Sequence, residues 1–346
     1  MWGLINIFDN SLMKNKLTYI VLGLSLGIIL MIFTFASTDT NDPDSEYRDL
    51  FCRYTKVFVP EVPEKAAFAG EKAPLQVYFI RESFEREIMA STFMHSTTLQ
   101  MFKRAYRWFP VIEPILKKNG IPDDFKFLAV AESNLGNVVS PSGAEGPWQF
   151  LKVTGQKYGL EINADVDERY NLEKATQAAC EYFKDGFSKF KNWTLVAASY
   201  NRGIDGISKA LSKQGVMNYY DLYLNEETAR YIYRILAIKE VYNSPTRYGF
   251  YTVEHDFYPA VATQTITIDS TVMDLPELSR HLKINYRILR ELNPWIQSYT
   301  LPNKSRKTYK IKLPKDPSSL LYENLLKKIP RQETFFHDTL KINSIH

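Results

Sequence analysis

The sequence predicts a mainly α-helical domain that is followed by a small β-α-α-β unit and preceded by one apolar helix. Three observations lead to this fold class. Apolar residues recur every three or four positions between residues 76 and 251, strand-like alternation flanks two short helical segments after residue 263, and residues 17–38 carry no charge. The 346 residues are 45% hydrophobic and 24% charged, which is typical of a chain with a hydrophobic core.

The uncharged run at residues 17–38 is long enough to cross a bilayer, which takes about 20 apolar residues. Lysines precede it at positions 14 and 16, and residues 39–46 carry four acidic side chains. The basic flank predicts that residues 1–16 stay in the cytoplasm and that the rest of the chain is exported. We therefore expect a transmembrane anchor. A cleaved signal peptide is the alternative, because a loose small-x-small motif ends at Ala36.

Residues 39–75 contain four prolines among charged and small residues, which indicates a linker. Residues 76–251 then form the predicted helical domain. Its helices are expected at 84–105, 107–120, 123–133, 171–190, 192–201 and 226–242. Asn119-Gly120 is a typical helix end, and Asp123 or Asp124 can cap the helix that follows.

A small unit is expected at residues 263–315. Strand-like alternation at 263–269 and 307–314 encloses two short helical segments, 275–284 and 285–293. The remaining residues, 316–346, are polar and without a strong pattern, so we expect a frayed tail.

Charge and cysteine usage exclude several classes of protein. The net charge is +4, from 43 basic and 39 acidic residues, and no basic block suggests a nucleic-acid partner. Cys52 and Cys180 lie far apart and form no CxxC motif, which excludes a zinc site or a disulfide scaffold as the organising principle. Two buried free thiols are favoured over one disulfide. The sequence contains no cluster of metal ligands and no phosphate-binding loop.

Glu132 is the candidate for acid-base chemistry. It ends the apolar helix DDFKFLAVAES and precedes a loop rich in Gly, Ser and Asn. Burial at such a position disfavours the charged carboxylate and raises its pKa, as a general acid requires near neutral pH. A solvent-exposed helix end is the alternative, although a negative charge there opposes the helix dipole.

Four blocks of sequence resemble the lytic transglycosylases of the lysozyme-like superfamily, which includes goose-type lysozymes and soluble lytic transglycosylases. The membrane-bound lytic murein transglycosylase D group is the closest. The blocks occur in the family's order: GIPDDFKFLAVAES, SPSGAEGPWQF, AASYNRG and ETARYIYRILAI. They cover about residues 120–240. The resemblance implies a lysozyme-like fold for the helical domain.

The resemblance also implies roles for single residues. Glu132 resembles the family's only acid/base, and Ser133 the residue that orients it, through a hydrogen bond to the carboxyl. The residues implied to bind or position the sugar are Gln149, Trp148, Tyr200, Asn201 and Tyr231. For Trp148, a place in the core is the equal alternative to stacking on a sugar ring. Pro147-Trp148 and Arg202 depart from the usual family pattern, and we expect both to reshape sugar subsites without abolishing activity.

The implied reaction cleaves the bond between N-acetylmuramic acid and N-acetylglucosamine in peptidoglycan, and leaves a 1,6-anhydromuramoyl end without consuming water. The resemblance also implies that neither a metal nor an organic cofactor is needed. A lysozyme-type hydrolase and a non-catalytic wall-binding protein are the competing interpretations. The implied location is the bacterial cell envelope, with the catalytic domain in the periplasm, either anchored to the membrane or released by signal cleavage. Residues 263–315 resemble a degenerate LysM module, but TQTITIDSTVMD replaces the usual opening, so glycan binding and a purely structural role are both open.

Overall fold

The computed structural model describes residues 57–252 and 256–326. The expected anchor at 17–38, residues 39–56 of the expected linker and residues 327–346 of the expected tail lie outside these ranges, as does Cys52. Within them, no helix combines the length and the apolar character needed to cross a bilayer.

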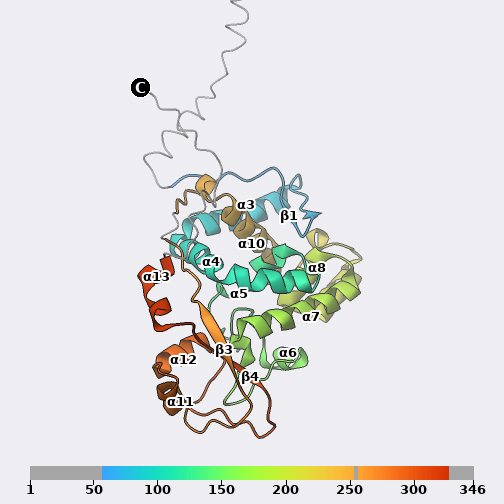
Figure 1. Cartoon of the computed structure of the whole chain (residues 1–346). Helices are drawn as coiled ribbons and strands as arrows, with labels where there is room; N and C mark the ends of the chain where they lie inside the picture. The colour runs from blue at the N-terminus through green and yellow to red at the C-terminus, as the bar shows by residue number, and fades with distance from the viewer. Residues whose placement is uncertain (1–56, 253–255, 327–346) are drawn as a thin grey trace, which may run out of the picture. The chain divides into compact units, whose positions relative to one another are not determined.

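The helical domain has a single hydrophobic core to which all of its long helices contribute. The helices are α3 (Tyr78–Phe93), α4 (His95–Lys118), α5 (Lys126–Ser133), α6 (Lys152–Lys157), α7 (Leu172–Phe190), α8 (Trp193–Arg202), α9 (Ile204–Gln214) and α10 (Glu226–Asn243). Helix α10 packs against α3, α5 and α8, while α7 packs against α4 and α8. The short helix α5 packs against two longer ones, α4 and α10 (Figure 1).

Most predicted helices are present, with different boundaries near residue 100. The sequence predicted a break between 105 and 107, but the chain breaks at Met94 and α4 then runs without interruption to Lys118. Helix α4 tolerates Pro110 and Pro114 because the two prolines are four residues apart and exposed on one face. Carbonyl groups that lose their intrahelical partner there can bond to water. Helices α6 and α9 were not predicted.

The end of the expected linker belongs to the folded domain. Strands β1 (Ala67–Phe68) and β2 (Glu71–Lys72) form an antiparallel hairpin, and Phe68 is fully buried. The Glu71 carboxylate accepts hydrogen bonds from the backbone N–H groups of Trp193 and Thr194 at the start of α8. An acidic side chain at a helix N-terminus is favourable, so the hairpin is part of the α8 cap.

Neither predicted aspartate caps the 123–133 segment, which begins as a short 3₁₀ helix. Asp123 instead pairs with Lys126. Asp124 accepts hydrogen bonds from the Ala69 backbone N–H and the Lys239 ammonium. Asp124 thus ties the hairpin to α10.

The predicted β-α-α-β unit is present. Strand β3 (Thr263–Ile268) pairs antiparallel with β4 (Tyr309–Pro314), in the register Thr263 to Pro314 and Ile268 to Tyr309. Helices α11 (Leu275–His281) and α12 (Tyr286–Leu292) lie between the strands in sequence, as Figure 1 shows. A separate hydrophobic cluster forms the core of this unit. Part of the expected tail is helical, as a short 3₁₀ helix (Pro317–Leu320) and α13 (Tyr322–Leu326).

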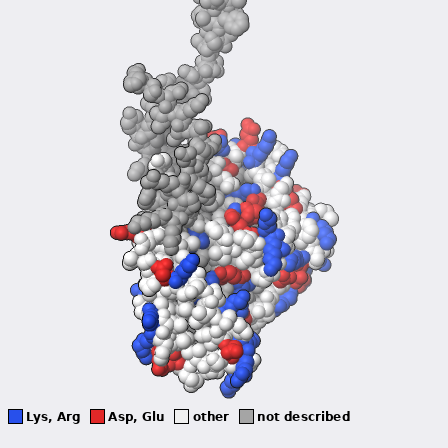
Figure 2. All heavy atoms as spheres, in the orientation of Figure 1, with Lys and Arg blue, Asp and Glu red and all other residues white. Residues whose placement is uncertain are grey.

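Basic and acidic side chains alternate over the face of the molecule in Figure 2. That face therefore presents no continuous patch of one sign. Cys180, on α7, is a buried free thiol, and burial raises its pKa to about 12.

Candidate active site

Glu132 lies in the last turn of α5, with its side chain half-buried. The apolar face of this short helix, from Phe127 to Val130, is buried in the core. Asn134 ends the helix in the left-handed conformation, with φ of 51°. The core therefore fixes the helix, while the turn at Asn134 leaves the Glu132 carboxyl at the edge of the packed region.

The Tyr231 hydroxyl donates a 2.5 Å hydrogen bond to Glu132 Oε1. Tyr231 comes from α10 and is almost fully buried. Burial and the neighbouring Glu132 raise the pKa of Tyr231 well above its usual value, so its hydroxyl keeps the proton that it donates. The structure thus brings together two of the residues predicted from sequence.

Burial also raises the pKa of Glu132 to about 7. The Tyr231 hydrogen bond and the Arg234 guanidinium oppose this shift, whereas the negative charge of Glu227 adds to it. Desolvation is the largest of these effects. It raises the pKa because it penalises the carboxylate and not the neutral acid. A carboxyl with this pKa can both donate and accept a proton near neutral pH.

Ser133 does not make the predicted hydrogen bond to Glu132. Its hydroxyl lies 2.8 Å from the carbonyl oxygen of Pro147 and 3.2 Å from that of Ala129. The hydroxyl oxygen in turn accepts a hydrogen bond from the Gly136 backbone N–H. The Ser133 hydroxyl is thus hydrogen-bonded to backbone groups, and its contact with Pro147 anchors the loop that contains Pro147 to the end of α5.

We call residues 143–150 the substrate loop. Gln149 lies within it in the left-handed region, with φ of 50°. Its amide nitrogen donates hydrogen bonds to the carbonyl oxygens of Val138 (2.9 Å) and Gly146 (2.8 Å). Both amide protons are therefore used within the protein. Among the described residues, none donates a hydrogen bond to the side-chain carbonyl of Gln149, which is a half-buried residue.

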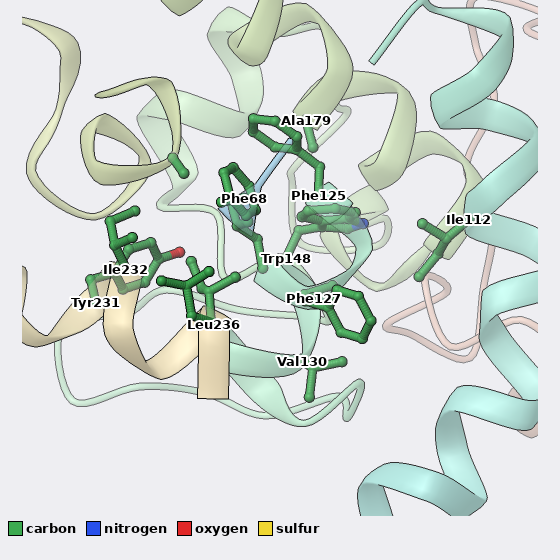
Figure 3. Close-up of a cluster of buried hydrophobic side chains, with 14 of the residues drawn as sticks. Phe68, Ile112, Phe125, Phe127, Val130, Trp148, Ala179, Tyr231, Ile232 and Leu236 are labelled. Atoms are coloured by element: carbon green, nitrogen blue, oxygen red, sulfur yellow. The ribbon is translucent and has the colours of Figure 1, made fainter. Parts of the chain in front are cut away.

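Trp148 is a core residue and not an exposed stacking platform. Its side chain is fully buried, and its indole N–H donates a 2.9 Å hydrogen bond to Thr176 Oγ1 on α7. Figure 3 shows Trp148 in one cluster with Phe125 and Phe127. Of the two alternatives left open for Trp148, the structure supports the place in the core, because a fully buried ring offers no face to a ligand.

Tyr200, on α8, contacts the same loop. Its hydroxyl donates a 2.7 Å hydrogen bond to the Trp148 carbonyl oxygen, and its ring packs edge-on against Trp148 and Phe150. Burial first, and then the charge of Glu132, raise the pKa of Tyr200 well above its usual value. Tyr200 therefore lies near the carboxyl, but its polar atom supports the substrate loop.

Asn201 connects the end of α8 to the start of α10. Its amide nitrogen donates to Glu227 Oε1 at 3.0 Å, and its carbonyl accepts from the Thr228 hydroxyl at 2.8 Å. The sequence reasoning did not single out Glu227 or Thr228. The sequence could have indicated them, because they are the first two residues of the fourth block, ETARYIYRILAI, and precede Tyr231 by about one helical turn.

A pocket of about 520 Å³ adjoins Asn201 on the side of α9. Arg202 lines it and donates a 2.6 Å hydrogen bond to Asn225 Oδ1. Lys209, Lys213 and Glu226 also line it. Arg202, one of the two departures from the family pattern, is thus one of three basic residues in the lining of this pocket.

Glu145 is not the solvated loop charge that its position suggests. It is half-buried and forms a 3.0 Å ion pair with the buried Arg169. The described residues contain no group of three or more His, Cys, Asp or Glu side chains placed to hold a metal ion.

Comparison with known proteins agrees with the predicted resemblance. Residues 109–222 match the transglycosylase SLT domain, and residues 264–317 match the soluble lytic transglycosylase C-terminal LysM-like domain. The first three sequence blocks lie in the SLT match, and the fourth lies just beyond it.

Two similar proteins are both named membrane-bound lytic murein transglycosylase D, one from Escherichia coli strain K12 and one from Escherichia coli O6:H1. Each is 26% identical over 273 residues, which cover 77% of this chain. The chain spans 58% of the length of these relatives.

Proposed function

Because the chain contains a transglycosylase SLT domain followed by a LysM-like domain, we propose that it is a peptidoglycan lytic transglycosylase. Its substrate is the glycan strand of peptidoglycan, cut at the β-1,4 bond between N-acetylmuramic acid and N-acetylglucosamine. The observation that carries this proposal is the half-buried Glu132, whose pKa of about 7 and hydrogen bond from Tyr231 suit a group that gives and then takes a proton.

In the first step, protonated Glu132 transfers its proton to the glycosidic oxygen as the bond from that oxygen to C1 breaks. The positive charge that develops on the muramoyl ring is stabilised by the substrate's own acetamido group. Glu132 is now a carboxylate, and the Tyr231 hydroxyl still donates to it. That hydrogen bond holds the carboxylate in place for the second step.

In the second step, the Glu132 carboxylate takes the proton of the C6 hydroxyl, whose oxygen forms the new bond to C1. One bond to C1 is broken and one is made, Glu132 ends protonated as it began, and no water is consumed. Glycosidases that use two carboxylates need a second acidic group at a set separation. A single carboxyl suffices here because the substrate supplies the nucleophile.

The other site residues position the sugar, the substrate loop and the helix that contains Tyr231. The free carbonyl of Gln149 is placed to accept a hydrogen bond from the sugar, and Tyr200 and Ser133 hold the substrate loop to α8 and α5. Asn201 holds α8 against the start of α10, the helix that contains Tyr231. None of these roles needs a metal or an organic cofactor.

The proposed location is the periplasm of a bacterial cell envelope. The support is the uncharged run at 17–38, with basic residues before it and acidic residues after it. The two relatives are named as membrane-bound proteins, which agrees with an anchored form.

Mass spectrometry of the products tests the proposal. Purified peptidoglycan is digested with the full-length chain in detergent and with Glu132→Gln. The control is Glu181→Gln, which changes a half-exposed carboxylate on α7. We expect anhydromuropeptides from the wild type and from Glu181→Gln, and none from Glu132→Gln. Products heavier by one water would identify a lysozyme-type hydrolase, and no soluble products would favour a wall-binding protein.

A further inference from the structure

One contact between the LysM-like domain and the helical domain is made by a short segment, residues 165–167, which we call the docking strand. The Asp167 backbone N–H donates to the Trp295 carbonyl at 2.8 Å, and the Gln297 N–H donates to the Asp165 carbonyl at 2.7 Å. Between these bonds, Val166 is 1% exposed and belongs to the hydrophobic core of the LysM-like domain. The docking strand therefore contributes to both domains.

Arg169 lies two residues after the docking strand and is 5% exposed. Its guanidinium binds the equally buried Asp167 carboxylate in a forked geometry. Nε lies 2.9 Å from Oδ1, and Nη2 lies 2.6 Å from Oδ2. A buried pair of this kind is rigid, because either charge left alone would remain desolvated without a partner.

The same guanidinium holds both ends of the substrate loop. Nη1 donates to the carbonyl oxygens of Gly143 and Phe150, each at 3.2 Å, and Nη2 lies 3.0 Å from Glu145 Oε1. The loop also packs directly on the backbone of Arg169. A Cβ atom at Gly146 would lie 2.1 Å from the Arg169 carbonyl oxygen, so only glycine fits there.

The substrate loop contains Gln149 and the Pro147 carbonyl that Ser133 contacts next to Glu132. We infer that Arg169 is a positioning residue, which transmits the docking of the LysM-like domain through Asp167 to the substrate loop. The loop is then set for substrate only while that domain is docked. The consequence for catalysis rests on the proposed function, but the consequence for the loop does not.

Other contacts join the two domains without reaching the substrate loop. Lys312 on β4 forms an ion pair with Glu173 on α7, and Lys307 pairs with Glu161 at 3.0 Å. These pairs are half-exposed and contribute to docking alone, so they provide controls. A lysine at position 169 would keep the charge but lose the planar fork, which reaches five acceptor atoms on four residues.

Hydrogen–deuterium exchange of the full-length chain, measured below the melting temperature, tests the inference without any need for activity. For Arg169→Lys we expect the amides of residues 143–150 to exchange at least tenfold faster than in the wild type. For Lys312→Gln we expect no change in those amides. Steady-state kinetics on peptidoglycan should show KM raised about tenfold by Arg169→Lys, with kcat within threefold.

Undocking the LysM-like domain should produce the same change at a distance. Val166→Asp places a charge in the core of that domain, whereas Val153→Asp changes a valine that is 79% exposed. We expect faster exchange of residues 143–150 in Val166→Asp and not in Val153→Asp. Val166→Ala serves as the milder variant if the aspartate prevents folding. For it we expect a smaller increase in the exchange rate of residues 143–150.

Two outcomes would overturn the inference. One is unchanged exchange of residues 143–150 in Arg169→Lys. The other is faster exchange in the undocked variants that is confined to residues 160–170 and 263–315. A wild-type chain that makes no anhydro products while its loop responds as expected would reject the proposed function and leave this coupling intact.

Discussion

The hydroxyl of Tyr231 lies 2.5 Å from Oε1 of Glu132, a residue 99 positions earlier in the chain. Helix α10 packs against the short helix α5, and this contact brings the two side chains together. The tyrosine keeps its proton and donates this hydrogen bond to a carboxyl whose pKa is raised to about 7.

Replacing Tyr231 by phenylalanine should reduce kcat and shift the pH dependence. A hydrogen bond to a charged group contributes about 1.5–3 kcal/mol, which corresponds to a loss of roughly 10- to 100-fold. Because this bond favours the carboxylate, its removal raises the pKa of Glu132 further. The fall of activity on the alkaline side, centred near pH 7 in the wild type, should move to higher pH. Initial rates of anhydromuropeptide release from pH 5 to 9 measure both effects.

Tyr233→Phe is the matched control, because Tyr233 is buried on the same helix. We expect that variant to keep the wild-type pH profile. An unshifted profile in Tyr231→Phe would show that the hydrogen bond does not influence the acid.

Glu132→Gln should stabilise the protein more at pH 8 than at pH 5. The folded-state pKa of Glu132 is raised to about 7, so the group contributes stability below its unfolded pKa and loses it as pH rises through 7. Glutamine removes the desolvated charge and keeps an acceptor for Tyr231. After allowance for its partial exposure, the gain at pH 8 should exceed the gain at pH 5 by about 1–2 kcal/mol. Urea denaturation at the two pH values measures the difference, and equal gains would contradict the raised pKa.

Trp148→Phe should destabilise the fold with little effect on glycan binding. The smaller ring leaves a cavity beside Thr176 and removes the indole hydrogen bond, at a cost of about 1–3 kcal/mol. The free energy of unfolding should fall by that amount, while KM well below the melting temperature stays within about twofold. A stable variant with weakened binding would restore the stacking role that the structure excludes.

Gln149→Ala should raise KM about tenfold, since it removes the loop's hydrogen bonds to Val138 and Gly146 as well as the free carbonyl. Gln149→Glu separates these effects, because it keeps an acceptor for the sugar and loses both donors. If the loop bonds dominate, the two variants should have a similar KM. Isothermal titration with a glycan oligomer in the Glu132→Gln background measures the binding part alone.

The spacing of apolar residues predicted most of the helices and both strands of the LysM-like unit. Burial of one face of a helix or strand makes apolar residues recur at a regular interval in the sequence. The break between the first two long helices was predicted at 105–107, but it lies at Met94, and α4 runs from His95 to Lys118. The hairpin at Ala67–Lys72 was taken for linker because two-residue strands leave no period to detect.

Among the site residues, the sequence singled out Glu132 and Tyr231 by their motifs, and the structure joins them. Ser133 and Trp148 were assigned contacts that they do not make. Their hydrogen-bond partners, Pro147 and Thr176, are chosen by how loops and helices pack, which no local pattern encodes. Arg169 was missed for the same reason, because its partners at 143, 145 and 150 lie in a different segment.

The sequence by itself determined the identity of the two domains and of the candidate acid, since residue types at set spacing carry that information. Only the tertiary structure decided the protonation of Glu132, the burial of Trp148 and the link from the docking strand to the substrate loop. Desolvation and hydrogen-bond geometry depend on which groups surround an atom in space, and those groups come from segments far apart in the chain.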